Sequence, residues 1–315
     1  MNLQDRYRGC LMGLAVGDAL GVPNEFKPRG SFQKVNEMIG GGPFHLRPGE
    51  WTDDTSQALC IGESLLYKGE FYPPDVMDKF WCWVEFGYMS STGKMFDIGE
   101  TTSDALCYYR KTGNSLAGLV VSADNKKSGN GSIMRLAPIP LFFKDGPHPA
   151  SWMDNSVISS TITHGSYNCI GSCVLLSRLI IGALNQMPKE AMLNSDFFIK
   201  NELVQKSIKD FTPEVIDIAM GIYKNKTEEQ IKSTGYVIHT LEAALWCFHT
   251  TDNFEDGCVK AVNLGEDADT VGAVFGQLAG AYYGYDAIPK RWADKIVFTG
   301  KIIEIADGIY KKRPI

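Results

Sequence analysis

The chain has 315 residues, 44% of them apolar and 22% charged, and its 31 Lys and Arg against 37 Asp and Glu give a net charge of −6. This length suits one large domain or two small ones, and the composition excludes a disordered chain, a collagen and a coiled coil. The acidic balance argues against non-specific binding to the phosphates of a nucleic acid.

Apolar residues recur at helical spacing in nearly every patterned segment, and no convincing alternating pattern of a strand occurs. In chain order, helices are predicted over Ser56–Leu66, Val76–Phe86, Ile170–Leu184, Val215–Tyr223, Val237–Phe248 and Ile296–Tyr310. Turn residues mark the segments Pro23–Gly49, Ser122–Gly131 and Lys144–Pro149. None of these segments has the length or low complexity of a domain linker. We therefore expect an all-α fold, a compact orthogonal bundle of about a dozen helices in a single domain over residues 1–315.

Two helices carry a glycine at every fourth position, although glycine weakens a helix by up to about 1 kcal/mol per position. The two sets are Gly9, Gly13, Gly17 and Gly21, and Gly272, Gly276, Gly280 and Gly284. This spacing places each set on one ridge of its helix, where a second backbone can approach closely. Two interpretations fit: the two helices pack against each other in the centre of the bundle, or each contacts other helices independently.

Acidic residues and threonines gather at two predicted helix starts, which contain Thr52, Asp53 and Asp54, and Asp267, Asp269 and Thr270. Taken singly, each group fits the N-cap and first turn of a helix, which favour these residue types. Taken together, they supply hard oxygen donors and enough charge for two Mg²⁺ or Mn²⁺ ions. Zinc is disfavoured, because no histidine and cysteine have ligand spacing. A further acid, Glu25, follows a glycine-lined helix and by itself fits a solvated loop.

Two further segments combine glycine with polar residues. Ser128–Arg135 is a small-residue loop ahead of an apolar helix, so its backbone amides and the Ser132 hydroxyl are candidates for binding a diphosphate. The loop matches neither the Walker A motif nor the dinucleotide fingerprint, and a simple turn followed by a cap is the alternative. Phe96–Thr102 repeats an acid, a glycine and threonines, and Asp97 or Thr101 as an N-cap is the simpler interpretation there.

Seven short motifs together resemble the ADP-ribosylglycohydrolase family, and within it the branch of the dinitrogen reductase-activating glycohydrolases. The motifs lie at residues 17–25, 52–55, 97–102, 129–135, 162–164, 235–240 and 263–273. The resemblance extends from Gly9 to about Trp292, and the two paired motifs of acids and threonines are its most specific part.

The resemblance implies an all-α fold around two Mg²⁺ or Mn²⁺ ions. It also implies hydrolysis of the bond between ADP-ribose and a protein side chain, with arginine as the first candidate. By this resemblance, the metal ligands are Thr52, Asp53, Asp54, Asp267, Asp269 and Thr270, and the catalytic acids are Glu25 and Asp97. The substrate cleft is implied at Gly99, Thr102, Asn130, Gly131, Ser132, His164 and Tyr236. The implied partners are an ADP-ribosylated protein and a cognate ADP-ribosyltransferase.

Three departures from the family pattern concern the acceptor side of the cleft. A second histidine that relatives carry soon after His164 is absent, His239 stands where an aspartate is expected, and Glu266 replaces a glycine. Other functions therefore stay open. They are hydrolysis of serine-linked ADP-ribose, O-acetyl-ADP-ribose or ADP-ribosylated nucleic acid, a non-catalytic immunity or crystallin-like protein, and a metal-dependent phosphohydrolase. The intact acidic motifs argue against the non-catalytic proteins, and product analysis distinguishes the phosphohydrolase.

The location of the protein is predicted from its ends, its apolar stretches and its cysteines. We find no secretory signal at the N-terminus, and a polar residue interrupts each of the three most apolar stretches, so we expect no membrane span. The eight cysteines include no Cys-x-x-Cys pair. Free thiols in a reducing cytoplasm are therefore expected.

Overall fold

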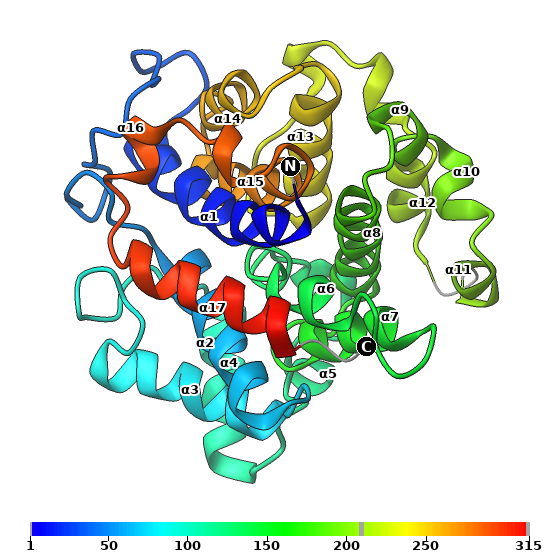
Figure 1. The fold of residues 1–315 in the computed structure, drawn as a ribbon. Helices are drawn as coiled ribbons and strands as arrows, with labels where there is room; N and C mark the ends of the chain where they lie inside the picture. Colours follow the sequence, from blue (N-terminus) through cyan, green and yellow to red (C-terminus); the bar gives the residue numbers. More distant parts are fainter. Residues whose placement is uncertain (1, 208–210, 313–315) are drawn as a thin grey trace.

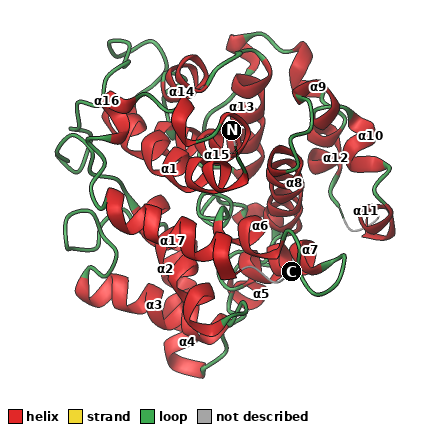
Figure 2. Cartoon of the chain, viewed as in Figure 1, coloured by secondary structure: helices red, strands yellow, loops and turns green. Residues whose placement is uncertain are grey.

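The computed structural model describes residues 2–207 and 211–312, and these residues form helices joined by loops, with no strand beyond two isolated bridges (Figure 2). The longer helices are α1 (Leu3–Gly21), α2 (Asp53–Lys68), α3 (Pro73–Phe86), α4 (Glu100–Thr112), α7 (Ser151–Thr161), α8 (Tyr167–Leu184), α13 (Val237–His249), α14 (Phe254–Val262), α15 (Ala268–Tyr283) and α17 (Thr299–Lys312). The shorter ones are α5 (Gly118–Val121), α6 (Pro138–Phe143), α9 (Lys189–Met192), α10 (Ser195–Ile199), α11 (Glu202–Ser207), α12 (Pro213–Ala219) and α16 (Lys290–Ala293). The all-α prediction is confirmed.

The described residues contain 17 α-helices rather than about a dozen, because several connecting segments fold into helices of one or two turns. Two predicted helices also have wrong bounds. The segment predicted over Val215–Tyr223 leaves the helix after Ala219, because Gly221 takes a left-handed conformation with φ +78°. The helix predicted from Ile296 begins only at Thr299, since Phe298 has a φ of +57°.

The two glycine-ridged helices, α1 and α15, lie against each other in the centre of the molecule (Figure 1). A Cβ atom added to Gly9, Gly13 or Gly17 would lie less than 3.0 Å from the carbonyl oxygen of Gly280, Gly276 or Gly272, respectively. The first of the two interpretations is therefore correct. The pairs run in opposite directions, so the two helices are antiparallel, and Gly21 at the end of α1 contacts Asp269 at the start of α15. This packing joins two segments that are about 250 residues apart in sequence.

One apolar core surrounds this pair and includes residues from α2, α3, α6, α8, α13, α14 and α17. It supports the single domain over residues 1–315, which stays a prediction. Helix α8 has the length and mean hydropathy of a membrane span, although Arg178 interrupts it, but 83% of that span is buried inside the protein. Helix α8 is therefore placed as a core helix, and no other described helix passes the same test.

Candidate metal centre and substrate cleft

The N-terminus of α2 is held by a carboxylate from α1 and not by its own N-cap residue. Thr52 occupies the N-cap position, yet its side chain makes no capping bond. Instead, Asp18 accepts hydrogen bonds from the backbone N–H groups of Thr52 (2.9 Å) and Thr55 (3.1 Å) and from both hydroxyls (3.0 and 2.6 Å). Asp18 is fully buried, and this burial raises its pKa to about 6. The interpretation of the Thr52 side chain as a cap is therefore wrong, and that side chain is available to the site.

The start of α15 brings its carboxylates to the same place. Asp267 occupies the N-cap position of α15 but also makes no capping bond with its side chain. The Thr52 hydroxyl lies 3.4 Å from Asp269 Oδ2, and the Thr270 hydroxyl lies 3.5 Å from Asp54 Oδ1. The two predicted halves of a metal site, more than 200 residues apart in sequence, are thus adjacent in the fold.

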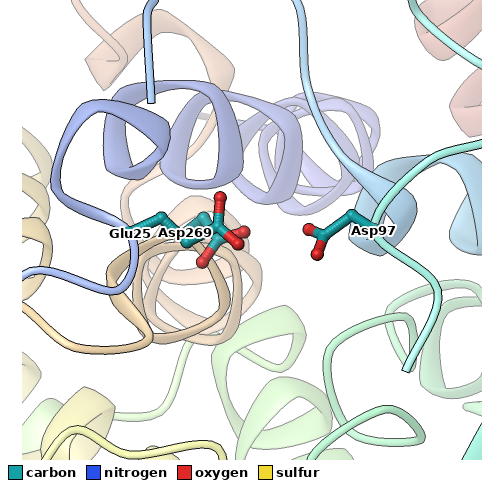
Figure 3. Close-up of side chains that lie close together, drawn as sticks. All are labelled: Glu25, Asp97 and Asp269. Carbon is teal, nitrogen blue, oxygen red and sulfur yellow. The ribbon is translucent and has the colours of Figure 1, made fainter. Parts of the chain in front are cut away.

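Three acids from three different elements point toward one another in this site (Figure 3). Glu25 follows α1, Asp97 precedes α4, and Asp269 lies in the first turn of α15, and one carboxylate oxygen from each lies within 4.8 Å of the other two. Glu25 and Asp269 are buried, and Asp97 is partly buried. Such a cluster is a candidate site for a hard divalent cation.

The raised pKa values of these carboxylates indicate that the cluster holds protons unless a cation takes their place. Burial, followed by repulsion from neighbouring acids, raises the pKa of Glu25 to about 9 and that of Asp97 to about 8. The same causes raise the pKa values of Asp53, Asp54 and Asp269 well above the usual range. Divalent cations would favour the charged forms.

Unpaired oxygens support the same conclusion. Glu25 Oε2, Asp54 Oδ2 and Asp269 Oδ1 are buried and accept no hydrogen bond from any residue that the structure describes. Buried polar atoms without a partner are rare, because leaving one unpaired costs about 1–3 kcal/mol. Three such oxygens in one cluster fit the coordination of Mg²⁺ or Mn²⁺.

Strained backbone surrounds the cluster. Phe26, Asp97 and Glu266 all have left-handed φ angles, between +56° and +61°. Such angles are uncommon for residues other than glycine and concentrate at functional sites. Helix α4 begins after Gly99, so the prediction of Asp97 or Thr101 as its N-cap is wrong. The backbone turns at Asp97 instead, and its carboxylate points to the cluster (Figure 3).

A cavity of about 340 Å³ opens above the acids. Eleven of the predicted site residues line it: Glu25, Asp53, Asp97, Gly99, Thr102, Asn130, Gly131, His164, Asp267, Asp269 and Thr270. Thr52 and Asp54 lie buried behind it. Tyr236 lines a second cavity of about 320 Å³, which shares Glu100, Thr101, Gly129 and Gly235 with the first, so the two cavities are parts of one cleft.

The glycine loop forms one wall of this cleft and is tied to the start of α13. Asn130 N donates to Gly235 O (3.1 Å), and Val237 N donates to Ser128 O (2.9 Å). The Asn130 side chain donates to Asp267 Oδ2 (2.8 Å), which links the loop to the acidic cluster. The loop therefore has a fixed position relative to the candidate metal site.

Two expectations for this loop are wrong. The residues after Gly131 form turns, and the next helix, α6, begins only at Pro138, so the loop does not lead directly into a helix. Pro138 occupies the first position of α6, where proline is favoured because that position needs no N–H donor. The Ser132 hydroxyl is fully buried and bonds to Ser160 (2.9 Å), so the structure does not bring this side chain to the cleft.

The two predicted aromatic residues have different surroundings. His164 is buried, and its burial together with the nearby Arg135 lowers its pKa to about 3, so the imidazole is neutral. The Tyr236 hydroxyl donates to Glu214 (2.9 Å) and accepts from Asn168 (2.7 Å), which leaves its ring to face the cleft. Both residues are thus held in place by the protein.

Sequence reasoning missed Asp18 and the buried Arg135 as parts of the site. Asp18 was visible as an acid inside an apolar helix with a glycine ridge, a position that is unfavourable unless the carboxylate is paired. Two departures from the family pattern also have an explanation. The backbone at Glu266 has a φ of +56°, a conformation that favours glycine, which explains why the family pattern has glycine there. His239 bonds to Thr234 (2.8 Å) and lies outside the cavity lined by the acids, so this departure leaves that cavity unchanged.

Comparisons with known proteins agree with this geometry. A sequence profile of the family described as ADP-ribosylglycohydrolase matches residues 1–314. The chain is 39% identical over 310 residues to the ADP-ribosylarginine hydrolase Tri1 of Pseudomonas putida (strain GB-1), which covers 98% of this chain and 79% of that protein. It is 31% identical over 299 residues to the ADP-ribosyl-[dinitrogen reductase] glycohydrolase of Rhodospirillum rubrum, which covers 94% of this chain and 91% of that protein.

Among solved structures, one titled as an ADP-ribosylglycohydrolase-related protein complex matches with a TM-score of 0.84 at 40% identity, over 99% of both chains. The extent and identity of these matches confirm the prediction made from the seven motifs. The chain belongs to the ADP-ribosylglycohydrolase family.

Proposed function

We propose that the protein hydrolyses the bond between ribose C1 of ADP-ribose and a guanidinium nitrogen of an arginine in a modified protein, using two Mg²⁺ or Mn²⁺ ions. The observation that carries this proposal is the convergence of Glu25, Asp97 and Asp269 at the base of a cleft, with buried oxygens that have no partner. The names of the relatives from Pseudomonas putida and Rhodospirillum rubrum support the substrate class.

Six residues are proposed to hold the ions: Thr52, Asp53, Asp54, Asp267, Asp269 and Thr270. The short distances from Thr52 to Asp269 and from Thr270 to Asp54 support this grouping. Bound divalent ions would polarise ribose oxygens and lower the pKa of water. Asp18 keeps the Thr52 hydroxyl hydrogen engaged, so the remaining lone pairs of that oxygen are free to face a cation.

Glu25 and Asp97 are proposed to handle the proton. In the reaction, the C1–N bond breaks, a water oxygen bonds to C1, and a proton from that water reaches the leaving nitrogen. Two carboxylates on opposite sides of the scissile bond can accept and return that proton and stabilise positive charge at C1. Glu25 and Asp97 come from different segments of the cavity wall and approach the cavity from different sides, which supports placing the scissile bond between them (Figure 3).

The rest of the ADP-ribose is proposed to lie along the cleft from the acids toward Tyr236. The backbone amide of Gly131, with the adjoining Gly99 and Thr102, is proposed to meet the diphosphate, while Asn130, whose own amide donates to Gly235, lines the cavity with its side chain. Ser132 would contribute only by supporting the loop from behind, because the whole residue is buried and its hydroxyl bonds to Ser160. The second cavity, lined by Tyr236, offers space for the remainder of the nucleotide.

The proposal is tested with a purified arginine-ADP-ribosylated protein, by chromatography of the released products with Mg²⁺, with Mn²⁺ and with EDTA. We expect free ADP-ribose in the presence of metal and none with EDTA, and a loss of at least about 100-fold in Asp269→Ala. The matched control is Asp252→Ala, because that carboxylate is fully exposed and distant from the cluster. Release that resists EDTA refutes the metal centre. Release of phosphate, or release only from serine-linked or O-acetyl conjugates, refutes the proposed linkage.

A cytoplasmic location is also proposed. All eight cysteines are free thiols, and six of them are buried. Free thiols persist in reducing compartments, where the proposed protein substrates would be met.

A further inference from the structure

A fully buried arginine lies behind the wall of the cleft, and the proposed function assigns it no role. Arg135 has no exposed surface, and its guanidinium lies over the ring of Phe80 at 4.6 Å. Its Nη1 donates to Gln57 Oε1, and its Nη2 donates to the Thr163 hydroxyl at 2.5 Å. A buried charge is costly unless its hydrogen bonds are made, so these two contacts fix the guanidinium.

One arm of this network ends at a predicted metal ligand. Because Gln57 Oε1 accepts from Arg135, the amide nitrogen of Gln57 must point the other way, and it donates to Asp53 Oδ2 at 2.9 Å. The orientation of the amide is thereby determined, since an arginine only donates hydrogen bonds. The guanidinium and the carboxylate are held at a fixed separation by one side chain.

The other arm ends at His164. The Thr163 hydroxyl accepts from Arg135 and lies 2.8 Å from His164 Nδ1. If Nδ1 were the donor, the hydrogen of this hydroxyl would have no acceptor among the described residues, so we take the hydroxyl to donate to Nδ1. A neutral imidazole that accepts at Nδ1 carries its hydrogen on Nε2.

The Nε2 edge of this imidazole faces the glycine loop. A Cβ atom added to Gly131 would lie 2.7 Å from His164 Cε1 and 3.1 Å from Nε2, and one added to Gly129 would lie 3.5 Å from Nε2. His164 also lines the cavity of the acids. The hydrogen on Nε2 is therefore presented beside the loop and not toward the core.

We propose that Arg135 is a positioning residue that acts through Thr163 and fixes His164 as the tautomer with hydrogen on Nε2. In this form, His164 supplies one neutral hydrogen-bond donor to an oxygen of ADP-ribose beside the glycine loop. This inference rests on the proposed function for the identity of the ligand. Arg135 also orients Asp53 through Gln57, so one guanidinium aligns the metal side and the substrate side of the site.

The tautomer is measured directly in the ligand-free protein by long-range ¹H–¹⁵N correlation with ¹⁵N-histidine, with His164→Gln assigning the signal among the five histidines. We expect hydrogen on Nε2 in the wild type and in Thr163→Ser, and a mixture of both tautomers in Thr163→Val, which has nearly the same shape but no hydroxyl. Hydrogen on Nδ1 in the wild type, or an unchanged tautomer in Thr163→Val, overturns the proposal. This measurement needs no substrate, so its outcome is independent of the proposed function.

Kinetics distinguish positioning from a general loss of structure. In Thr163→Val, KM for the arginine conjugate should rise about two- to tenfold, in proportion to the loss of the tautomer with hydrogen on Nε2, with little change in kcat and in the affinity for Mn²⁺. Thr163→Ser should restore KM. Arg135→Lys, which cannot reach both partners in the same geometry, should raise KM and also weaken Mn²⁺ binding. The matched control is Arg110→Lys, an exposed arginine that lies over Trp81. Equal effects of the two lysine variants, or a Thr163→Val variant that loses kcat alone, contradict the proposal.

Discussion

The close packing of α1 on α15 makes a strong prediction, because it sets the position of both halves of the site. Gly17 lies one residue before Asp18, and a Cβ added there would meet the backbone of Gly272 and Ala273 at less than 3.0 Å. Ordinary contact begins at 3.4 Å, and the opposing atoms are backbone, so no side chain can rotate to make room. Gly17→Ala must therefore move one helix relative to the other.

The size of the effect follows from this geometry. The added Cβ lies 2.0 Å from the Gly272 carbonyl oxygen, so reaching the ordinary contact distance of 3.4 Å requires the two helices to shift by about 1.4 Å along this contact. Overpacking of this kind costs about 1–3 kcal/mol. The better helix propensity of alanine returns up to about 1 kcal/mol, so we expect a loss of about 2 kcal/mol in the free energy of unfolding. Metal sites tolerate ligand shifts of only about 0.2 Å, so the affinity for Mn²⁺ should fall much more steeply than stability.

The assay combines urea unfolding with titration of Mn²⁺ into each variant. Gly13→Ala is the matched comparison, because it creates the same overlap, with Gly276, one turn farther from the acids. Gly300→Ala is the control for helix propensity, since no atom lies within 4 Å of its added Cβ, and it should be neutral or slightly stabilising. If Gly17→Ala keeps both the stability and the Mn²⁺ affinity of the wild type, the α1–α15 contact does not determine the site.

Three further predictions concern the acids and the strained backbone. Asp53→Ala should abolish Mn²⁺ binding at the site, as measured by calorimetry, while the helical circular dichroism stays unchanged. In EDTA, the melting temperature should fall as pH rises from 5 to 9, because the raised pKa values of Asp18, Asp97 and Glu25 (about 6, 8 and 9) mean that the folded state holds protons that the unfolded state releases. Mn²⁺ should stabilise the protein increasingly over the same range, and a melting temperature in EDTA that rises with pH would contradict this assignment. Glu266→Gly should raise the free energy of unfolding, measured in urea, by up to about 1 kcal/mol, because glycine adopts the left-handed φ of this position without strain. Glu266→Ala should leave the free energy of unfolding no higher than in the wild type.

The parts of the fold that depend on local periodicity were predictable from the sequence. Apolar spacing identifies α2, α3, α8 and α13, since a helix must bury one stripe whatever its partners are. The regular glycines predicted a close contact but left the partner open, because spacing describes one surface and not the surface that meets it. Short helices such as α9 and α16 were missed, since a single turn is too short to show a period.

The site was predicted less completely, because most of its contacts join distant segments. Thr52 and Asp267 stand at the N-cap positions of α2 and α15, as the sequence predicted, but neither side chain makes a capping hydrogen bond. In α2 the reason is that Asp18, on another helix, accepts the bonds from the first amides. Arg135 has partners 28 and 78 residues away, and no pattern in one sequence indicates them. Left-handed angles at residues that are not glycine, such as Asp97, are likewise fixed by tertiary contacts that no local rule contains.

The same antiparallel contact explains why both glycine ridges end in acidic motifs. Because α1 ends where α15 begins, the residues that continue from Gly21 and those that precede Gly272 are forced into the same small volume. Carboxylates gathered this closely repel one another, and their burial adds to the cost, so the arrangement destabilises the metal-free protein. The glycine ridges hold the two backbones together against that repulsion, which gives the acids a fixed separation before any cation binds. The cost of alanine at Gly17, measured by urea unfolding in EDTA, should accordingly be larger in a protein whose Glu25 and Asp269 are both changed to their amides, because the separation that alanine forces then no longer relieves repulsion between the acids.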